Sequence, residues 1–439
     1  MSILLDRYHD LLARTEPFQS SGVVLRVIGL TVVASGPAVP GGDVCRIEGM
    51  QGSRLAVVVG FRESEVVLQP IGSTDRIRAG DRVVAQGHPL EIPVGPGLIG
   101  RVIDGVGNPI DGLGPIPGNA RRSIHGEPPA PLGRRPIREL FETGIKSIDT
   151  IFTLGKGQRL GIFAGSGLGK STLLGEIAKH ATADVNVIAL VGERGREVGD
   201  FIDKVLGPEG LARSVVIVAT SDRPAVERLS AAYAAHAVAE HFRDAGLDVA
   251  LIMDSVTRFC QAQREVGLAA GEPPVTRGYP PSAFAILPKL LERAGTGRVG
   301  SITGLYTVLI DADDENDPVG DNARAILDGH LFLSRRLAGQ AIFPAIDPAL
   351  SISRLAIDLT TPEEFKLSGL AREMWGEYQR VRDLVEVGAY RKGADPRVDR
   401  AIAVQPKLLE FLRQDINVVV PRVDSLALLR AALGEGGAA

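Results

Sequence analysis

The 439-residue sequence has few cysteines, few aromatic residues and little net charge, and each shortage excludes a class of protein. Cys45 and Cys260 are its two cysteines, and they lie too far apart for a disulfide framework or a metal knuckle, which predicts two reduced structural thiols. A formal net charge of −4 gives no overall attraction for nucleic acid. Aromatic side chains, on which bases stack, make up only 5% of the chain. We therefore expect no nucleic-acid partner.

Long apolar runs are also absent. The first residues, MSILLDRYHDLLAR, place charged side chains among the apolar ones, so they lack the unbroken apolar core of a signal peptide. No window reaches the roughly 18 to 20 uncharged apolar residues of a membrane span. We predict a cytoplasmic protein, associated at most peripherally with the inner face of the cytoplasmic membrane. Its length and its 44% of apolar residues allow several cores, and hence several domains.

Residues 1–20 are predicted to contain one short amphipathic helix. Apolar side chains recur there at helical spacing, at Leu4, Leu5, Tyr8, Leu11 and Leu12. Such a helix either binds a partner protein or packs on its own domain, and the composition fits both roles.

Residues 21–95 form a different kind of sequence, in which short β-branched runs alternate with glycine-rich breaks. The runs are VVLRVIGLTVVA, DVCRIE, RLAVVVGF, EVVLQPI and DRVVAQG. Short strands at close intervals predict a small closed β-barrel, because closure removes exposed strand edges. A structural cap is the favoured role. An oligonucleotide-binding barrel is disfavoured because Phe61 is nearly the only aromatic residue available for stacking.

The remaining chain is predicted to form an α/β core and a helical end. Residues 94–135 are rich in glycine and proline, which favours a connector of turns and extended backbone. Across residues 96–360, apolar strands alternate with amphipathic helices, which predicts a parallel sheet covered on both faces. Strand signals fade after residue 360, and the helical periodicity of residues 361–439 predicts a small helical domain.

The strongest motif is AGSGLGKS, which lies between the apolar run RLGIFAG and the helical run STLLGEIAKH. This strand, loop and helix order is that of a phosphate-binding P-loop, in which glycines allow a tight turn and backbone N–H groups point at phosphates. Lys170 is predicted to reach the β and γ phosphates and Ser171 to ligate Mg²⁺. Ala164 replaces the usual first glycine, which matters little if Gly165 and Gly167 carry the turn. The predicted nucleotide-binding residues are Gly165, Ser166, Gly167, Leu168, Gly169, Lys170, Ser171 and Thr172.

Two carboxylates follow apolar strands at the edge where α/β sheets bind ligands. Asp254 ends the run VALIMD and is predicted to hold Mg²⁺ through a water molecule, or alternatively to cap the next helix. Glu193 ends the run VNVIALVG and is predicted to hold and deprotonate the attacking water. Glu197 is a second candidate base, although a helix dipole explains an acid at that position more simply.

Three further residues are candidates with simpler alternatives. Arg354 follows the run PAIDPALSIS and either is an ordinary surface charge or stabilises charge on the departing γ-phosphoryl group, an effect of about 10³ to 10⁵ in rate. Arg194, with its neighbour Arg196, is the alternative arginine for that role. Phe343 is either a platform for adenine or a core residue. The acidic run DADDENDP, residues 311–318, lacks the spacing and closing glutamate of a calcium loop and is predicted to be a solvated turn.

Taken together, the motifs resemble the flagellar and type III secretion export ATPases, relatives of the rotary ATP synthase α and β subunits. The resemblance extends from about residue 22 nearly to the end of the sequence. It rests on AGSGLGKSTLL, GERGRE, MDSVTRF, AQREVGLAAGEPPVTRGYPPSAFAILPKLLERAG, YTVL, ARAILDGHLFLSRRLA, PAIDPALSIS and VGAYRKGADPRVDRAI.

This resemblance implies an N-terminal β-barrel, a RecA-like P-loop core and a C-terminal helical domain, assembled as a ring-shaped homohexamer with ATP and Mg²⁺ between subunits. It implies that Lys170 contacts phosphates, that Glu193 acts on water and that Asp254 acts on Mg²⁺. It also implies that Phe343 contacts adenine and that Arg354 acts on the neighbouring subunit's nucleotide.

In that family, hydrolysis of ATP to ADP and phosphate helps to release export substrates from chaperones and to unfold them at the export gate. A stator-like regulator binds the N-terminal helix, and a stalk protein occupies the centre of the ring. The wording GSGLGKS and LARSVVIVATSD favours the flagellar system over the virulence injectisome.

Three alternatives remain. A rotary ATP synthase catalytic subunit shares the main motifs, but LPKLLERAGTGRVGSITGLYTVL and the C-terminal sequence fit the secretion branch better. A non-catalytic α-type subunit has glutamine where Glu193 stands. A Rho-like RNA translocase is disfavoured by the low aromatic content and the mild acidity.

Overall fold

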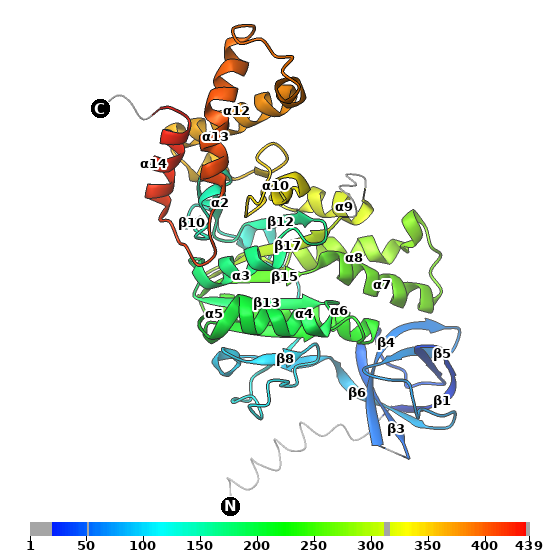
Figure 1. The fold of residues 1–439 in the computed structure, drawn as a ribbon. Coiled ribbons are helices and arrows are strands. Elements are labelled where there is room, and N and C mark those ends of the chain that lie inside the picture. Colours follow the sequence, from blue (N-terminus) through cyan, green and yellow to red (C-terminus); the bar gives the residue numbers. More distant parts are fainter. Residues whose placement is uncertain (1–19, 51, 311–316, 436–439) are drawn as a thin grey trace, which may run out of the picture.

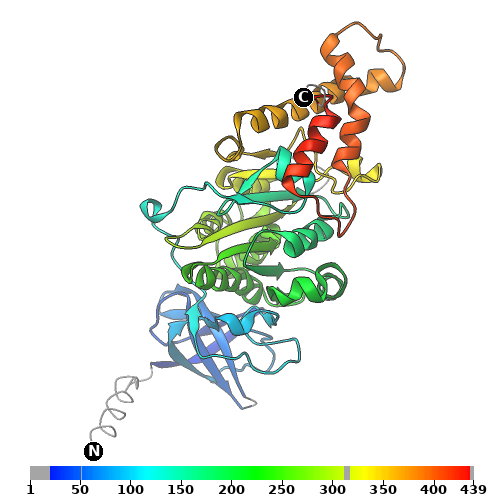
Figure 2. The same cartoon turned by 90° about the vertical axis from the view of Figure 1, so that its left-hand side faces the viewer.

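The computed structural model describes residues 20–50, 52–310 and 317–435 of the chain. Apart from their last residues, the predicted helix of residues 1–20 and the predicted turn of residues 311–318 lie outside these ranges. The described chain forms a β-barrel, a central sheet with helices on both faces and a group of C-terminal helices, arranged in that order along one long axis (Figure 1 and Figure 2).

The N-terminal barrel closes on itself in the order β1-β2-β5-β4-β3-β6. The first predicted run is divided at Gly29, whose φ of 57° allows the turn between β1 and β2. Alternate side chains fill the interior with small apolar groups such as Val32, Ala34 and Ala56. The strands are β1 (Ser21–Ile28), β2 (Thr31–Ala34), β3 (Asp43–Gly49), β4 (Gly52–Arg62), β5 (Glu65–Pro70) and β6 (Arg82–Pro89).

The glycine- and proline-rich segment does more than connect two domains. Its strand β8 (Val102–Asp104) pairs in parallel with β14 (Ser214–Ala219) and so forms one edge of the central sheet. The other short elements of the segment are β7 (Glu91–Pro93), η1 (Pro96–Leu98), β9 (Arg121–Ser123) and η2 (Pro131–Gly133), followed by β10 (Leu140–Phe141) and β11 (Leu154–Gly155). Arg293 ties this segment to the core, because its Nη1 donates to the Ile124 carbonyl at 2.7 Å while its Nε donates to Glu240 Oε1 at 2.7 Å.

The central sheet has nine strands, with the order β19-β18-β12-β17-β15-β13-β14-β8 and β16 beside β17. Its pairs are parallel except those made by β16 and β19. The parallel strands consequently end at one common edge. Their bounds are β12 (Arg159–Ala164), β13 (Val185–Val191), β15 (Asp248–Asp254), β16 (Gly295–Thr296), β17 (Ser301–Leu309), β18 (Gly329–Phe332) and β19 (Ile352–Ser353).

Two hydrophobic clusters cover the two faces of this sheet. Along β13, Val187 and Ala189 pack in the cluster that contains α6, α7 and α8, whereas Ile188 and Leu190 pack in the cluster that contains α3. This alternation is the period of two expected for a strand buried on both faces. The helices of this part are α3 (Lys170–His180), α4 (Gly195–Asp200), the π-helix η3 (Phe201–Leu206), α5 (Gly207–Ala212), α6 (Ala225–Asp244), α7 (Val256–Ala270), η4 (Thr276–Gly278), α8 (Pro281–Leu291), α9 (Pro318–Ile326) and α10 (Arg335–Gly339).

The C-terminal helices share a core with the sheet domain. Trp375, Phe411 and Leu429 belong to the same cluster of buried residues as Leu173 and Leu174 of α3. The elements are α2 (Lys146–Ile151), which packs against them, and α11 (Ala356–Leu359), α12 (Pro362–Glu386), α13 (Pro396–Leu412) and α14 (Arg422–Ala432). The predicted fold class, an α/β core with a β-barrel and a helical C-terminal part, is confirmed. Within the described ranges, none of the helices is both long enough and apolar enough to cross a membrane.

Candidate functional site

The loop of residues 165–169 joins β12 to α3 at the common edge of the parallel strands. Gly167 and Gly169 have φ values of 78° and 80°, in the left-handed region that L side chains rarely adopt. Ser166 and Gly167 are exposed, while Leu168 is buried and anchors the loop. Helix α3 begins without a side-chain cap, so its first N–H groups remain for a ligand. This is the anion-binding geometry that the motif predicts.

Gly165 has a different role from the one expected. It is not among the glycines with positive φ, so the tight turn rests on Gly167 and Gly169. A Cβ at Gly165 would lie 2.9 Å from Nη2 of Arg335, the first residue of α10. Gly165 therefore leaves room for a guanidinium group beside the loop. Arg335 was not among the predicted residues, because its only signal in the sequence is a pair of arginines shortly after the apolar run LFL.

Beside the loop, the Lys170 ammonium group lies between two carboxylates. It donates a hydrogen bond to Asp254 Oδ1, and its Nζ lies 3.8 Å from Glu193 Oε1. The same Asp254 oxygen accepts a hydrogen bond from Thr307 Oγ1 at 2.7 Å. These residues meet because β13, β15 and β17 are neighbouring strands that run parallel. The structure thus brings the predicted residues Lys170, Glu193 and Asp254 together, and it adds Thr307.

The alternative role of Asp254 as a helix cap is wrong. Helix α7 begins at Val256, and its N-cap is Ser255, whose side chain accepts a hydrogen bond from the Arg258 N–H. Asp254 lies one residue earlier, at the end of β15, and only 5% of its side chain is exposed. Its carboxylate therefore does not cap the helix and instead accepts hydrogen bonds from Lys170 and Thr307.

Glu193 is a partly buried carboxyl group whose pKa is higher than that of an ordinary glutamate. Burial, and next the charge of Asp254, raise the pKa of Glu193 to about 7, although the Lys170 charge opposes them. Its Oε1 is buried and has no hydrogen-bond partner within the described part of the chain. A carboxyl group with a pKa near neutrality is suited to accept and release a proton.

Glu197 is the partner of Glu193 in this proton equilibrium. Its partial burial disfavours ionisation, but its hydrogen bond with Glu193 and the charge of Arg194 lower the pKa of Glu197. Arg194 Nη1 lies 3.1 Å from Glu197 Oε1. Glu193 therefore carries the shared proton while Glu197 is the ionised member, which supports Glu193 as the group that titrates near neutrality.

The oxygen ligands at this edge suit a small hard cation. Ser171 is exposed in the first turn of α3, and Asp254 lies beside Lys170. In the ranges that the structure describes, no three His, Cys, Asp or Glu side chains form a metal site. Magnesium is commonly held by one or two protein oxygens together with phosphate oxygens and waters. A hydroxyl and a carboxylate beside a phosphate-binding loop fit that pattern.

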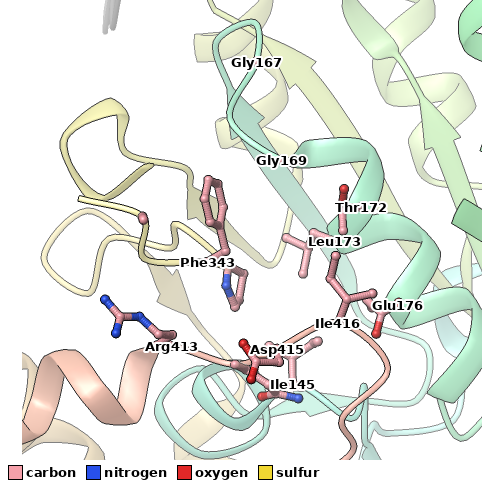
Figure 3. Close-up of a pocket in the computed structure, with 13 residues that line it drawn as sticks. Ile145, Gly167, Gly169, Thr172, Leu173, Glu176, Phe343, Arg413, Asp415 and Ile416 are labelled. Carbon is pink, nitrogen blue, oxygen red and sulfur yellow. The ribbon is translucent and has the colours of Figure 1, made fainter. Parts of the chain in front are cut away.

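A pocket of about 430 Å³ adjoins the loop on the side of the C-terminal helices (Figure 3). Phe343 forms one wall, with its ring 3.2 Å from the position of a Cβ on Gly169, and 41% of the residue is exposed. Phe343 is thus a pocket residue, and the alternative that it belongs to the core is wrong. The pocket is lined by Ile145, Gly167, Gly169, Thr172, Leu173, Glu176, Ala341, Phe343, Pro344, Arg413, Gln414, Asp415 and Ile416.

The far wall of this pocket comes from the C-terminal domain and was not predicted. Residues 413–416 directly follow α13, and they line the pocket together with α3 and Phe343. The only signal in the sequence is the run RQDIN, where helical periodicity stops without a glycine. Its position against α3 depends on tertiary packing, which single-sequence patterns do not reveal.

The candidate arginines lie elsewhere. Arg354 is exposed and follows β19, with its Nη2 donating to the Arg324 carbonyl at 3.2 Å. Arg194 and Arg196 are also exposed and pair with Glu197 and Asp200 on the next turn. Among the described residues, none of these arginines lines the pocket. One chain therefore assembles the loop of residues 165–169 with Lys170, Glu193 and Asp254, which we call the phosphate end, and the neighbouring pocket. It leaves the candidate arginines on its surface.

Comparisons with known proteins agree with this architecture. Residues 24–87 match the β-barrel domain of the ATP synthase alpha/beta family, and residues 144–353 match its nucleotide-binding domain. Residues 360–431 match the C-terminal domain of the type III secretion ATPase EscN.

Relatives and solved structures match over nearly the whole chain. The flagellum-specific ATP synthase of Bacillus subtilis (strain 168) is 50% identical over 97% of this chain and 98% of its own. The type 3 secretion system ATPase of Xanthomonas euvesicatoria is 48% identical over 93% of both chains. The structure of the assembled ATPase EscN from enteropathogenic E. coli is 43% identical, with a TM-score of 0.88 over 94% of this chain and 100% of that one. The chain therefore belongs to the family of flagellar and type III secretion ATPases, and it is a P-loop ATPase.

Proposed function

We propose that this ATPase hydrolyses ATP to ADP and phosphate in order to drive or gate protein export through the flagellar type III apparatus, where it releases export substrates from chaperones and unfolds them. The cluster of Lys170, Glu193 and Asp254 carries the proposed hydrolysis, and the 50% identity to the flagellum-specific ATP synthase of Bacillus subtilis carries the proposed pathway. A virulence injectisome is the second candidate, because the Xanthomonas relative and EscN are nearly as similar as the flagellar one.

In the proposed mechanism, the backbone N–H groups of residues 165–169 and the Lys170 ammonium bind the phosphates of ATP. A phosphate oxygen replaces Asp254 as the partner of Lys170. Ser171 and, through a water molecule, Asp254 would then hold Mg²⁺. Held there, Mg²⁺ would supply positive charge that neutralises the phosphates. Glu193 orients the attacking water and accepts its proton. Phe343 contacts adenine, and Arg354 of a neighbouring copy stabilises the transferred γ-phosphoryl group.

The proposed assembly is a homohexamer at the inner face of the cytoplasmic membrane. It is supported by the similar structures of assembled EscN and of EscN with its central stalk EscO. We propose a stalk protein in the centre of the ring, a stator-like regulator on the N-terminal helix, and contacts with the export gate and with chaperone-bound substrates. An exposed Arg354 is consistent with an active site that a second copy completes.

Gene replacement tests the proposed pathway. In Bacillus subtilis without its flagellum-specific ATP synthase, we expect this chain to restore swimming, because the two proteins share 50% identity over nearly their full lengths. The variant Lys170→Ala serves as the control and should restore none. Restored secretion in Xanthomonas euvesicatoria without its type 3 secretion system ATPase, with no restored swimming in Bacillus, would favour the injectisome.

Substitutions at the phosphate end test the chemistry. We expect Glu193→Gln to lower the rate of phosphate release by about 10² to 10⁴ while ATP still binds, because only the proton acceptor is lost. Lys170→Ala should lose both hydrolysis and tight ATP binding, measured by phosphate release and by calorimetry. Lys204→Ala, which alters an exposed lysine of η3, is the control. Full activity in either site variant contradicts the assignment.

The raised pKa of Glu193 predicts a dependence of stability on pH in metal-free protein. The unfolded carboxyl group ionises at about pH 4.3, whereas the folded one keeps its proton to about pH 7. Stability is therefore lost as the pH rises between these values. We expect Glu193→Gln to raise the thermal midpoint at pH 8 by a few degrees, corresponding to about 1 to 3 kcal/mol after solvent screening. The gain should vanish at pH 4, and a gain equal at both pH values contradicts the raised pKa.

Mixing experiments test whether Arg354 acts between subunits. We expect Arg354→Ala to fold and bind ATP but to lose about 10³ or more of its hydrolysis rate. Mixing it with inactive Lys170→Ala should restore turnover, because some contacts then pair an intact Lys170 with an intact Arg354. The rate per chain of the unmodified protein should also rise with concentration as light scattering detects assembly. Absence of rescue in assembled mixtures argues against action between subunits.

A further inference from the structure

The segment of residues 413–418 crosses the end of the pocket between α13 and α14. Asp415 and Ile416 line the pocket from this segment, while Phe343 lines it from another part of the chain (Figure 3). The segment has no regular secondary structure over residues 413–415, so the backbone hydrogen bonds of a helix or strand do not hold it in place. Contacts with α3 and with the start of α2 hold it instead.

Glu176 of α3 forms the main link to the segment. Its Oε2 accepts a hydrogen bond from the backbone N–H of Asn417 at 2.6 Å. Its Oε1 lies 2.5 Å from Lys179 Nζ, and Lys179 Nζ in turn donates to Asn417 Oδ1 at 2.6 Å. His180 Nε2 lies 3.8 Å from the Glu176 carboxylate. Glu176, Lys179 and Asn417 thus form a closed triangle that fixes the residue after Ile416.

Gln414 forms a second link on the other side of the segment. Its Nε2 donates to the carbonyls of Gly144 and Val418 at 2.7 and 2.6 Å, and its Oε1 accepts from the Lys146 N–H at 2.8 Å. The Gln414 backbone N–H donates to the Phe343 carbonyl at 2.8 Å. The segment is therefore held to the opposite wall of the pocket through Gln414 and to α3 through Glu176.

The position and burial of Glu176 set it apart from an ordinary surface acid. It lies one helical turn after Thr172 on the helix that begins at Lys170, and only 6% of it is exposed. A buried carboxylate is costly unless hydrogen bonds and an opposite charge compensate it, and here Asn417 and Lys179 supply both. Glu176 also lines the pocket, and its hydrogen bond to Asn417 links α3 to the segment.

We infer that Glu176 is a positioning residue for the base end of the nucleotide, acting through Asn417 to hold Ile416 against the pocket. The inference rests on the proposed nucleotide site. Within the described residues, Glu176 forms no hydrogen bond or ion pair with Lys170, Glu193 or Asp254, so its removal is expected to alter the base end and to leave the phosphate end intact. Affinity for a ligand that has a base then falls, while affinity for a phosphate chain without a base does not.

The test compares ATP with inorganic tripolyphosphate, both with Mg²⁺, by titration calorimetry on the full chain. We expect Glu176→Ala to weaken ATP binding about tenfold, the effect of losing one charge-assisted hydrogen bond, while tripolyphosphate binding changes less than about twofold. Glu176→Gln keeps an acceptor oxygen and should restore most of the ATP affinity. Glu373→Ala, at an exposed acid of α12 that does not line the pocket, should bind both probes as the unmodified chain does.

A second variant keeps the inference testable if Glu176→Ala does not fold. Asn417 has a φ of 62°, which glycine adopts freely, so Asn417→Gly removes only the side-chain contact with Lys179. It should weaken ATP binding by about twofold to fivefold and leave tripolyphosphate binding unchanged. Equal losses for both probes, or no loss of ATP affinity, overturn the positioning role. Unmodified protein that binds neither probe instead overturns the nucleotide site itself.

Discussion

The position of the Lys170 ammonium group between Asp254 and Glu193 is the interaction on which the site depends. Two carboxylates that are both largely buried, with exposed side-chain fractions of 5% and 16%, repel each other and lose solvation. One cation cannot neutralise both carboxylates, so the two acids are stabilised in different ways. Asp254 forms the direct hydrogen bonds with Lys170 and Thr307, while Glu193 keeps a proton up to about pH 7. A phosphate chain that draws Lys170 away therefore changes the charge balance of both acids.

The topology of the sheet makes this arrangement possible. Strands β12, β17, β15 and β13 are consecutive neighbours, so the loop after β12 meets the acids that end β15 and follow β13 at one edge, although these segments lie far apart in the sequence. Period-two burial on both faces fixes the register of each strand, and a slip by one residue would exchange its two faces. The hydrophobic clusters thus position the polar site indirectly.

The parts of the site that could be predicted are those that local sequence determines. A glycine-rich loop between a strand and a helix is recognisable in the sequence, and so is an acid at the end of an apolar run. Both features belong at the edge where parallel strands end, so the sequence alone predicts that Lys170, Glu193 and Asp254 lie at one site. Thr307, Arg335 and the segment after α13 could not be predicted, because they reach the site through strand pairing and domain packing. The same reason applies to β8, which has the composition of a connector and yet completes the sheet. The helix cap is Ser255 and not the predicted alternative Asp254, because a sequence pattern does not locate a helix end to within one residue.

The pocket beside the phosphate loop is built by two parts of the chain, the sheet domain and the segment after α13. The phosphate end belongs to the sheet, whereas the pocket beside it is closed by a segment between α13 and α14, and both share one hydrophobic cluster. A further contact joins Trp375 of α12 to Asp347 in the run PAIDPALSIS, where Nε1 donates to Oδ1 at 3.0 Å. The last two residues of this run form β19, and Arg354 follows them. Gln414 thus connects the segment after α13 to the Phe343 carbonyl at the pocket, and Asp347 connects α12 to the run that precedes Arg354. Both regions therefore depend on how the C-terminal helices pack against the sheet domain, with which they share one hydrophobic cluster.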